Sequence, residues 1–160
     1  MSTTDILTAC LARLALFVAS PGYPVAWPGV HLDPPNTGYW LEPRLFPNEP
    51  TNYGWDDESC INSVGFFQVL VMYRHGGGQI NASDIADDVI DYFAKGQELG
   101  PVRVYKKPHQ SPAVILDDKS YIPVTIQYRG LTSTVDVSTA TYVVNGGVLV
   151  TNNSIQVVNT

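Results

Sequence analysis

Apolar and polar positions follow two different periods along the chain, and together they predict helices set among strands. Residues 4–19 and 81–95 repeat apolar side chains every three or four positions, which is helical spacing. Four other segments are rich in β-branched and aromatic residues, as strands are. These expected strands are 39–46, 61–74, 101–107 and 121–129. The order of the segments predicts an α+β domain.

The two expected helices carry their own end signals. Thr4 is the expected cap of the first, Asp5 suits the positive end of its dipole, and Pro21 follows its end. Asn81 is the expected cap of the second, with Asp84 three residues on, as in a capping box. The apolar face of the second helix is expected to hold Ile85, Ala86, Val89, Ile90 and Phe93. Its polar face is expected to hold Asp84, Asp87, Asp88 and Asp91.

Prolines and turn residues mark the connections. Residues 20–38 contain five prolines, yet aromatic and aliphatic side chains alternate through them from Tyr23 to Leu32. Alternation with prolines indicates an edge strand, or an arm laid across a sheet. Pro43 likewise predicts an edge or a bulge in strand 39–46. Residues 47–60 are expected to form a polar loop, and the connection between the last two strands holds a short apolar stretch, 113–116.

The segment 131–160 differs from the rest, since Asp136 is its only charged residue. We therefore divide the chain into a domain, 1–130, and an extension or arm, 131–160. Two apolar runs flanking Asn145-Gly146-Gly147 predict a β-hairpin in this extension. A nearly uncharged hairpin with open edges is an aggregation hazard, so we expect it to pair within an assembly, although folding onto its own domain remains open. The expected contact residues are Tyr142, Val143, Val144, Val148, Leu149 and Val150.

The composition narrows the class of partner. The 160 residues suit one domain, or one domain plus an arm, and 44% hydrophobic residues are enough for a core. Only 15% are charged, against roughly 25% in an average soluble domain. A surface poor in charge indicates partial cover by a partner. The net charge of −6 argues against binding to nucleic-acid phosphates, but is compatible with DNA sliding past.

Motifs for catalysis or cofactors are not found in the sequence. Cys10 and Cys60 form no CxxC pair and are expected to be buried thiols. The three histidines show no metal-ligand spacing, and Gly76-Gly77-Gly78 lacks the GK[ST] ending of a phosphate loop. The apolar run 6–19 is too short to span a bilayer, and no Lys or Arg precedes it as in a signal peptide. We expect a non-enzymatic protein without cofactor or metal, located in the cytoplasm when made.

One ordered set of segments carries a family resemblance. The set begins with the first helix and continues with 24–30, 39–43, 45–47, 65–71, the turn 76–78, 86–96 and 121–128. In this order and spacing the chain resembles the phage tail terminator-like family, which is related in fold to the tail terminators of lambda-like siphophages. The resemblance covers residues 4–130. The segment from Leu131 onward is not part of the pattern.

The resemblance implies a mostly antiparallel sheet with two helices packed against it. It also implies a structural virion protein, a hexameric ring on the last ring of the tail tube. Such a ring stops tube polymerisation and presents a surface to the head-closure or neck proteins, so the implied partners are further copies, the tube protein and the neck. The implied location is the tail or neck of the virion, after assembly in the host cytoplasm. No catalytic residues are implied.

Two other functions stay open at this stage. One is another neck or tail-completion protein of the same fold, and the other is a soluble small-ligand binding or enzymatic domain. For a ring, we expect DNA to pass through the lumen without specific binding, along a lining of acidic side chains. The acids expected to face the lumen are Asp56, Asp57, Glu58, Asp87, Asp88 and Asp91.

Overall fold

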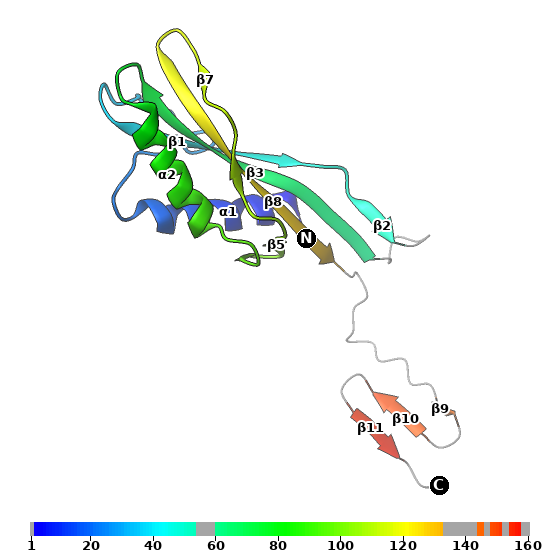
Figure 1. Ribbon diagram of the computed structural model, residues 1–160. Coiled ribbons are helices and arrows are strands. Elements are labelled where there is room, and N and C mark those ends of the chain that lie inside the picture. The colour runs from blue at the N-terminus through cyan, green and yellow to red at the C-terminus, as the bar shows by residue number, and fades with distance from the viewer. Residues whose placement is uncertain (1, 54–59, 133–143, 146–147, 152–153, 158–160) are drawn as a thin grey trace.

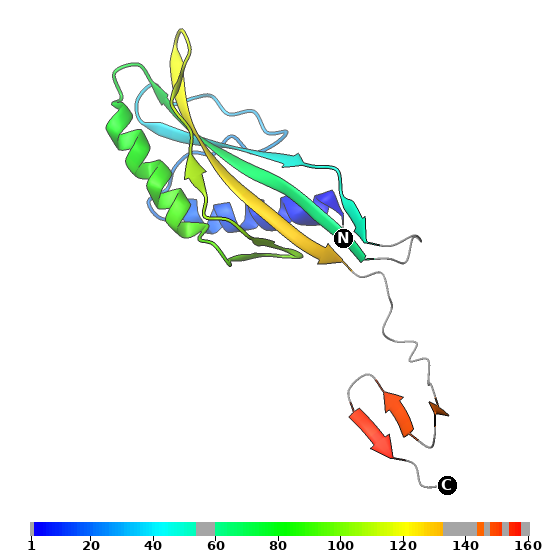
Figure 2. The same ribbon diagram turned by 45° about the vertical axis from the view of Figure 1, so that its right-hand side comes forward.

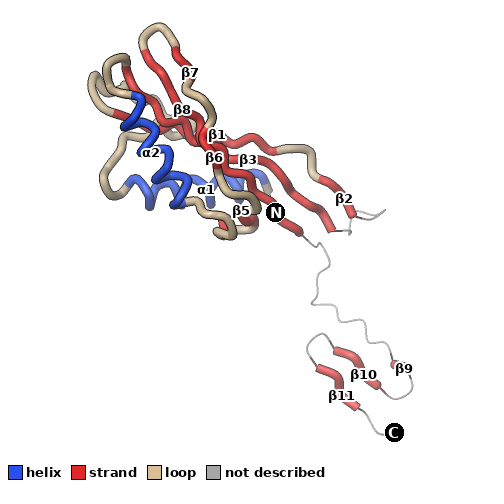
Figure 3. The backbone as a smooth tube through the Cα atoms, in the orientation of Figure 1, coloured by secondary structure: helices blue, strands red, loops and turns tan. Residues whose placement is uncertain are grey.

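The fold combines two helices with one long, curled sheet (Figure 1). The computed structural model describes residues 2–53, 60–132, 144–145, 148–151 and 154–157. Helices α1 (Thr3–Val18) and α2 (Gln79–Tyr92) lie on the same side of the sheet, as the helix and strand colours in Figure 3 show. All pairings between named strands are antiparallel. The expected α+β class, with a mostly antiparallel sheet and two helices against it, is confirmed.

The sheet is organised around two long central strands. Its order is β1-β3-β8-β5-β4, with β2 also on β3, and β6 and β7 also on β8. The strands are β1 (Tyr39–Pro47), β2 (Thr51–Tyr53), β3 (Cys60–Arg74), β4 (Glu98–Leu99), β5 (Val102–Val104), β6 (His109–Gln110), β7 (Val114–Ile115) and β8 (Lys119–Thr132). The four strands expected from sequence are present. The short strands β2, β4, β6 and β7 were not predicted, and β2 corrects the polar loop expected over 47–60.

The main core lies between the helices and the sheet. On β3 it takes every second side chain, among them Phe67, Val69 and Val71, each fully buried. From α2 it takes the apolar face expected from sequence: Ile85, Ala86, Val89, Ile90 and Phe93. The rings of Phe67 and Phe93 lie 5.9 Å apart at their centroids. The helix layer and the sheet are therefore joined by one continuous apolar core.

Two weakly acidic side chains, a thiol and a tyrosine hydroxyl, lie within this core. Cys10 is fully buried on α1, and this burial raises the pKa of its thiol to about 12. Tyr128 on β8 is 1% exposed; its burial, with the nearby Cys10, raises the pKa of its hydroxyl to about 12. The Tyr128 hydroxyl has no hydrogen-bond partner in the described part of the chain. Both groups thus favour the neutral form in the folded protein. Of the two expected buried thiols, Cys10 is confirmed, whereas nothing is described of the Cys60 side chain.

In the described part of the chain, no helix lies on the opposite face of the sheet. Trp40, Leu70 and Met72 alternate in sequence with core residues and therefore point to this second face. They form a small separate cluster, against which Leu32 and Tyr121 pack. Farther along the same face, the rings of Phe46 and Phe66 stack with centroids 4.8 Å apart. We call this the open face of the sheet.

The proline-rich segment 20–38 runs along the free edge of β1, as an arm. Its Val25 forms a parallel bridge with Leu41. The Leu41 amide donates to the Pro24 carbonyl at 2.9 Å, and the Ala26 amide donates to the Leu41 carbonyl at 2.8 Å. Pro43 lies two residues along the same strand, so its nitrogen also faces outward and has no hydrogen to donate. Both the arm and the edge position of Pro43 agree with the expectation from sequence.

Both helices start earlier than predicted. Ser2, not Thr4, caps α1: its hydroxyl accepts from the Asp5 amide at 3.1 Å, and the Asp5 carboxylate accepts from the Ser2 amide at 2.9 Å. This reciprocal pair is a capping box, and it places Asp5 at the third helical position. Gly78, not Asn81, caps α2, at φ 85° and without a side-chain hydrogen bond. A backbone at that angle favours glycine, which has no Cβ.

Arg13 explains why a charge interrupts the apolar first helix. Its guanidinium donates from Nη2 to the Tyr92 carbonyl and to the Gln97 side-chain oxygen, both at 3.1 Å. It also lies 4.1 Å from the centroid of the Tyr92 ring. Tyr92 ends α2, where carbonyls lack helical partners and cations are favoured. Arg13 therefore joins the two helices at this end.

The C-terminal segment forms a sheet of its own. Its order is β11-β10-β9, with β9 (Val144–Asn145), β10 (Val148–Thr151) and β11 (Ser154–Val157). Asn145 pairs with Val148 and Val144 pairs with Leu149, in the antiparallel manner of the expected hairpin. Strand β11 was not predicted from sequence. Tyr142 and Val143, also expected in the hairpin, lie outside the described residues.

Candidate functional site

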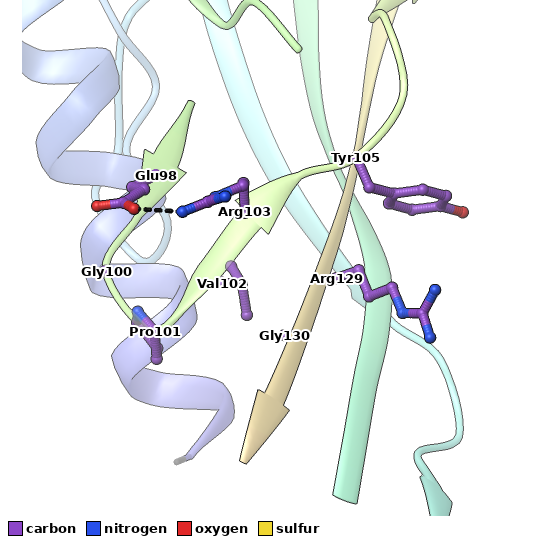
Figure 4. Close-up of a pocket in the computed structure, with 8 residues that line it drawn as sticks. All are labelled: Glu98, Gly100, Pro101, Val102, Arg103, Tyr105, Arg129 and Gly130. Atoms are coloured by element: carbon purple, nitrogen blue, oxygen red, sulfur yellow. Dashed lines mark hydrogen bonds and ion pairs between the residues drawn. The ribbon is translucent and has the colours of Figure 1, made fainter. Parts of the chain in front are cut away.

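Three surfaces of the domain are candidates for contact with a partner, and the first is a groove between the β4–β5 hairpin and β8 (Figure 4). Gly130 lets the hairpin approach closely, because a Cβ there would lie 2.8 Å from the Pro101 carbonyl oxygen. Arg103 donates to Glu98 at 2.6 Å, and both side chains are mostly exposed. The Arg129 side chain donates to the Asn62 oxygen at 3.0 Å. The groove is open and about 540 Å³ in volume, and three charged side chains and Tyr105 line it beside two glycines, a proline and a valine.

The second surface lies along the opposite edge of the sheet and is called the arm groove. It is bounded by α1, the arm and the outer side of β1, and its volume is about 530 Å³. Its apolar lining comprises Leu7, Trp27, Val30, Leu32, Pro43 and Leu45. Glu42 and Arg44 also line it and form an ion pair at 2.6 Å. The lining of the groove is thus mainly apolar and includes one ion pair.

The third surface is an apolar end of the sheet, which we call the apex patch. It comprises Ile80 (78% exposed), Val114 (37%), Ile115 (71%) and Leu116 (43%). Strand β3 ends at Arg74, opposite Lys119 where β8 begins, so the β7–β8 hairpin extends beyond the end of β3 (Figures 1 and 2). His75 shares a hydrogen bond of 2.8 Å with the Leu116 carbonyl, which fixes the hairpin to the turn before α2. A patch of this kind is typical of a protein–protein contact.

Helix α2 presents a row of carboxylates on the helix-covered side of the molecule. Asp84, Asp87, Asp88 and Asp91 are all exposed, as the amphipathic pattern predicted. Asp87 accepts a hydrogen bond of 3.3 Å from the Gln110 side chain. A groove beside the row is lined by Asp87, Asp91, Lys107 and His109. The structure therefore brings Asp87, Asp88 and Asp91 together on one exposed surface.

The other site residues expected from sequence lie in the C-terminal strands or outside the described residues. Asp56, Asp57 and Glu58 lie outside the described residues. Val144 is in β9, and Val148, Leu149 and Val150 are in β10. Within the described ranges, no three His, Cys, Asp or Glu side chains come together in a way that could hold a metal ion. No helix in those ranges is long and apolar enough to cross a membrane.

Sequence reasoning missed the apex patch and the arm groove. The apolar stretch 113–116 was recognised in the sequence, but its exposure arises because β7 lies at an edge of the sheet, on the outer side of β8, and no local pattern reports that position. The arm groove combines residues from three segments that are distant in sequence, α1, the arm and β1. Only the alternation within the arm indicated that this segment lies against a sheet.

Comparisons with known proteins agree with this architecture. A solved structure whose name states no function superposes with a TM-score of 0.64 at 26% sequence identity, covering 82% of this chain and 96% of that one. No match was found among curated proteins. The family model described as phage tail terminator protein matches residues 5–128. The protein thus belongs to the phage tail terminator family, and its role is that of a structural component of the phage tail.

Proposed function

We propose that copies of this protein form a closed ring, a hexamer as the family resemblance implies, at the head-proximal end of the tail. The ring ends polymerisation of the tail tube and joins the tail to the head-closure or neck protein. Family membership over residues 5–128 supports the assignment to this end of the tail. The protein acts in the virion after assembling in the host cytoplasm.

The observation that carries the proposal is the apex patch. Among the described residues, eight large hydrophobic side chains are exposed, and four of them belong to this patch. Scattered exposed apolar residues are ordinary, whereas three consecutive ones at one hairpin, Val114, Ile115 and Leu116, favour a protein partner. A cyclic ring needs two unlike surfaces on each copy, and the apex patch is a candidate for one of them.

The acidic row of α2 is proposed to face the lumen of the ring. Its exposed carboxylates Asp87, Asp88 and Asp91 would repel DNA phosphates and lower sticking as the genome passes. We keep Asp56, Asp57 and Glu58 in the same proposed lining. The DNA then contacts the ring without sequence recognition, since specific binding requires donors directed at base edges.

The C-terminal strands are proposed to take part in the assembly by strand pairing. The sheet β11-β10-β9 has no hydrogen-bonded link to the main sheet in the described ranges, so its outer strands keep open edges. An open edge can accept a strand of another chain. The proposed contact residues are Val144, Val148, Leu149 and Val150, with Tyr142 and Val143.

Electron microscopy of virions tests the proposed function. We expect density for this chain as one ring between tail tube and neck. Density repeated along the tube would make the chain a tube protein and overturn the proposal. Density confined to the neck, not touching the tube, would make it another neck protein of the same fold.

A further inference from the structure

We infer that neighbouring copies in the ring are joined by the apex patch of one copy seated in the arm groove of the next. This inference rests on the proposed ring and names the surfaces that would hold it together. The observations behind it are the exposure of apolar side chains, the place of both surfaces in the sheet, and their charges.

Apolar exposure is concentrated on these two surfaces. In the described part of the chain, five of the eight exposed large hydrophobic side chains belong to one or the other. Four form the apex patch, and Val30, which is 61% exposed, lines the arm groove. Moving such side chains out of water is the main favourable term in association. A contact between the two surfaces would cover five of these eight side chains.

The two surfaces lie at opposite edges of one sheet. β7 pairs with β8 on the side away from β3, because β3 pairs along the full length of β8. The arm groove lies beyond β1, which pairs with β3 on its other side. Joining opposite edges is a heterologous contact, in which each copy uses one surface on each neighbour. A heterologous contact closes a ring when its repeated rotation completes a full turn, as the proposed ring requires.

Shape and charge also match. The β7–β8 hairpin projects from the end of the sheet (Figure 2), and the arm groove is a hollow of about 530 Å³ that could receive it. Directly after Leu116 the hairpin carries the exposed acids Asp117 and Asp118. Arg44 borders the groove and uses two of its five N–H donors on Glu42. Its other donors are available to a carboxylate, so seating Leu116 would bring opposite charges together.

This arrangement joins the subunits along the two edges of the sheet, with Leu7 of α1 and Ile80 of α2 beside the contact. The carboxylates of α2 lie on the helix-covered side, outside both surfaces, and remain available for a lumen. The arm groove accepts a second copy rather than a tail-tube protein, because the apex patch of every subunit is then covered by an identical neighbour. A tube protein in that place would leave the apex patch uncovered.

Cross-linking between two single-cysteine variants tests the contact. Ile115→Cys and Val30→Cys are prepared in a Cys60→Ser background, since Cys10 is fully buried. The two variants are mixed, assembled on tail tubes and treated with a short bismaleimide. Leu16→Cys, on α1, 67% exposed and outside both surfaces, replaces Val30→Cys in the control mixture. Negative-stain microscopy of the same samples records whether rings are present.

We expect dimers from the 115 and 30 pair, none from the 115 and 16 pair, and a ladder when both cysteines are in one chain. Rings without the 115 to 30 cross-link would overturn this interface and leave the ring standing. Cross-linking of position 115 to the tube protein would overturn it as well, and would make the apex patch a tube contact. Tubes without any ring would remove the proposed function and this inference with it.

A matched pair of substitutions gives a second, independent measurement. Ile115→Asp and Leu16→Asp each replace an exposed aliphatic side chain, 71% and 67% exposed, so both variants are expected to fold. A charge at position 115 would have to be buried in the apolar groove, so we expect ring assembly to weaken by about tenfold or more. Equal assembly by both variants would contradict the contact.

Discussion

The two faces of the sheet carry very different side chains, although both are built from the same strands. On the helix-covered face, β3 contributes Phe67, Val69 and Val71, all fully buried beneath α1 and α2. On the open face the same strand contributes Phe66 and Gln68, which are only half-buried, beside the small cluster containing Leu70 and Met72. The helix-covered face is a core, whereas much of the open face is in contact with solvent.

This difference separates stability from assembly. Residues in the continuous core cannot be changed without loss of packing, since close-packed interiors relax only in part. Residues on the open face and at the sheet edges contribute less to folding and are therefore available for contacts with other copies.

Adjacent phenylalanines on β3 give the most direct comparison of the two faces. Phe67→Ala should lower the free energy of unfolding by about 3–5 kcal/mol, since Phe67 is fully buried against Phe93. Phe66→Ala should cost about 1 kcal/mol, because the side chain is half-buried and mainly stacks on Phe46. Urea unfolding followed by circular dichroism measures both. Equal losses would show that the open face is as much a core as the other.

Gly65 shows how tightly the helix-covered face is filled. A Cβ at this position would lie 2.4 Å from the Tyr128 hydroxyl and 2.7 Å from the Phe46 carbonyl oxygen. Gly65→Ala should therefore destabilise the domain by about 1–3 kcal/mol through overpacking. Adding Tyr128→Phe should restore only part of the loss, since the carbonyl contact remains. Thermal unfolding of the single and double variants checks this. If Gly65→Ala left the stability unchanged, the core beside Gly65 would have space for a methyl group.

Alkaline pH should weaken the helix-covered face through its buried thiol. The folded protein holds the pKa of Cys10 at about 12, above the 9.0 of an unperturbed thiol. Between these values the unfolded chain releases a proton that the folded chain retains. Stability therefore falls as pH rises from about 9 to about 12, by up to about 1.4 kcal/mol per pH unit.

The variant Cys10→Ala isolates this contribution. Its stability should fall less steeply over the same pH range, because it lacks the thiol, whatever its stability at neutral pH. Urea unfolding at several pH values provides the slopes. Parallel slopes for the two proteins would show that Cys10 ionises as readily in the folded chain as in the unfolded one.

The ion pair on β1 should give the smallest effect. Arg44 and Glu42 lie 2.6 Å apart, with side chains 51% and 29% exposed. Water and salt screen a pair with this exposure, so their coupling should be only about 0.2–1 kcal/mol. A double-mutant cycle with Glu42→Gln and Arg44→Gln, repeated at high salt, measures it. A larger coupling that persists in salt would place the pair in a drier environment than its exposure indicates.

Most of the central helices and strands were predictable from the sequence, because the spacing of their apolar side chains determines which of them are buried. The apolar run of β3 and the two faces of α2 are examples, as is the edge position of Pro43. Helix starts were less predictable: Ser2 with Asp5 satisfies the capping-box spacing that Thr4 does not, whereas Gly78 acts through its backbone angle alone. Strands of two residues, such as β6 and β7, are too short to show any period.

The candidate surfaces were predictable only in part. Asp87, Asp88 and Asp91 were expected on one exposed face, because helical spacing determines it. The apex patch depends on β7 pairing with the outer side of β8, and the arm groove depends on where the arm crosses β1. Both are properties of long-range pairing, which a single sequence does not display.

The outer edge of β1 has a consequence for the behaviour of the protein at high concentration. Of its outward-facing positions, Leu41 is bonded to the arm, and Pro43 and Pro47 have no amide hydrogen. On the part of β1 beyond the arm, only the Leu45 amide remains as an outward-facing hydrogen-bond donor. One donor is too few to pair with a new strand. Concentrated solutions are therefore shielded from edge-to-edge fibril growth through β1. Any association at this edge must proceed through side chains, which limit it to partners of matching shape.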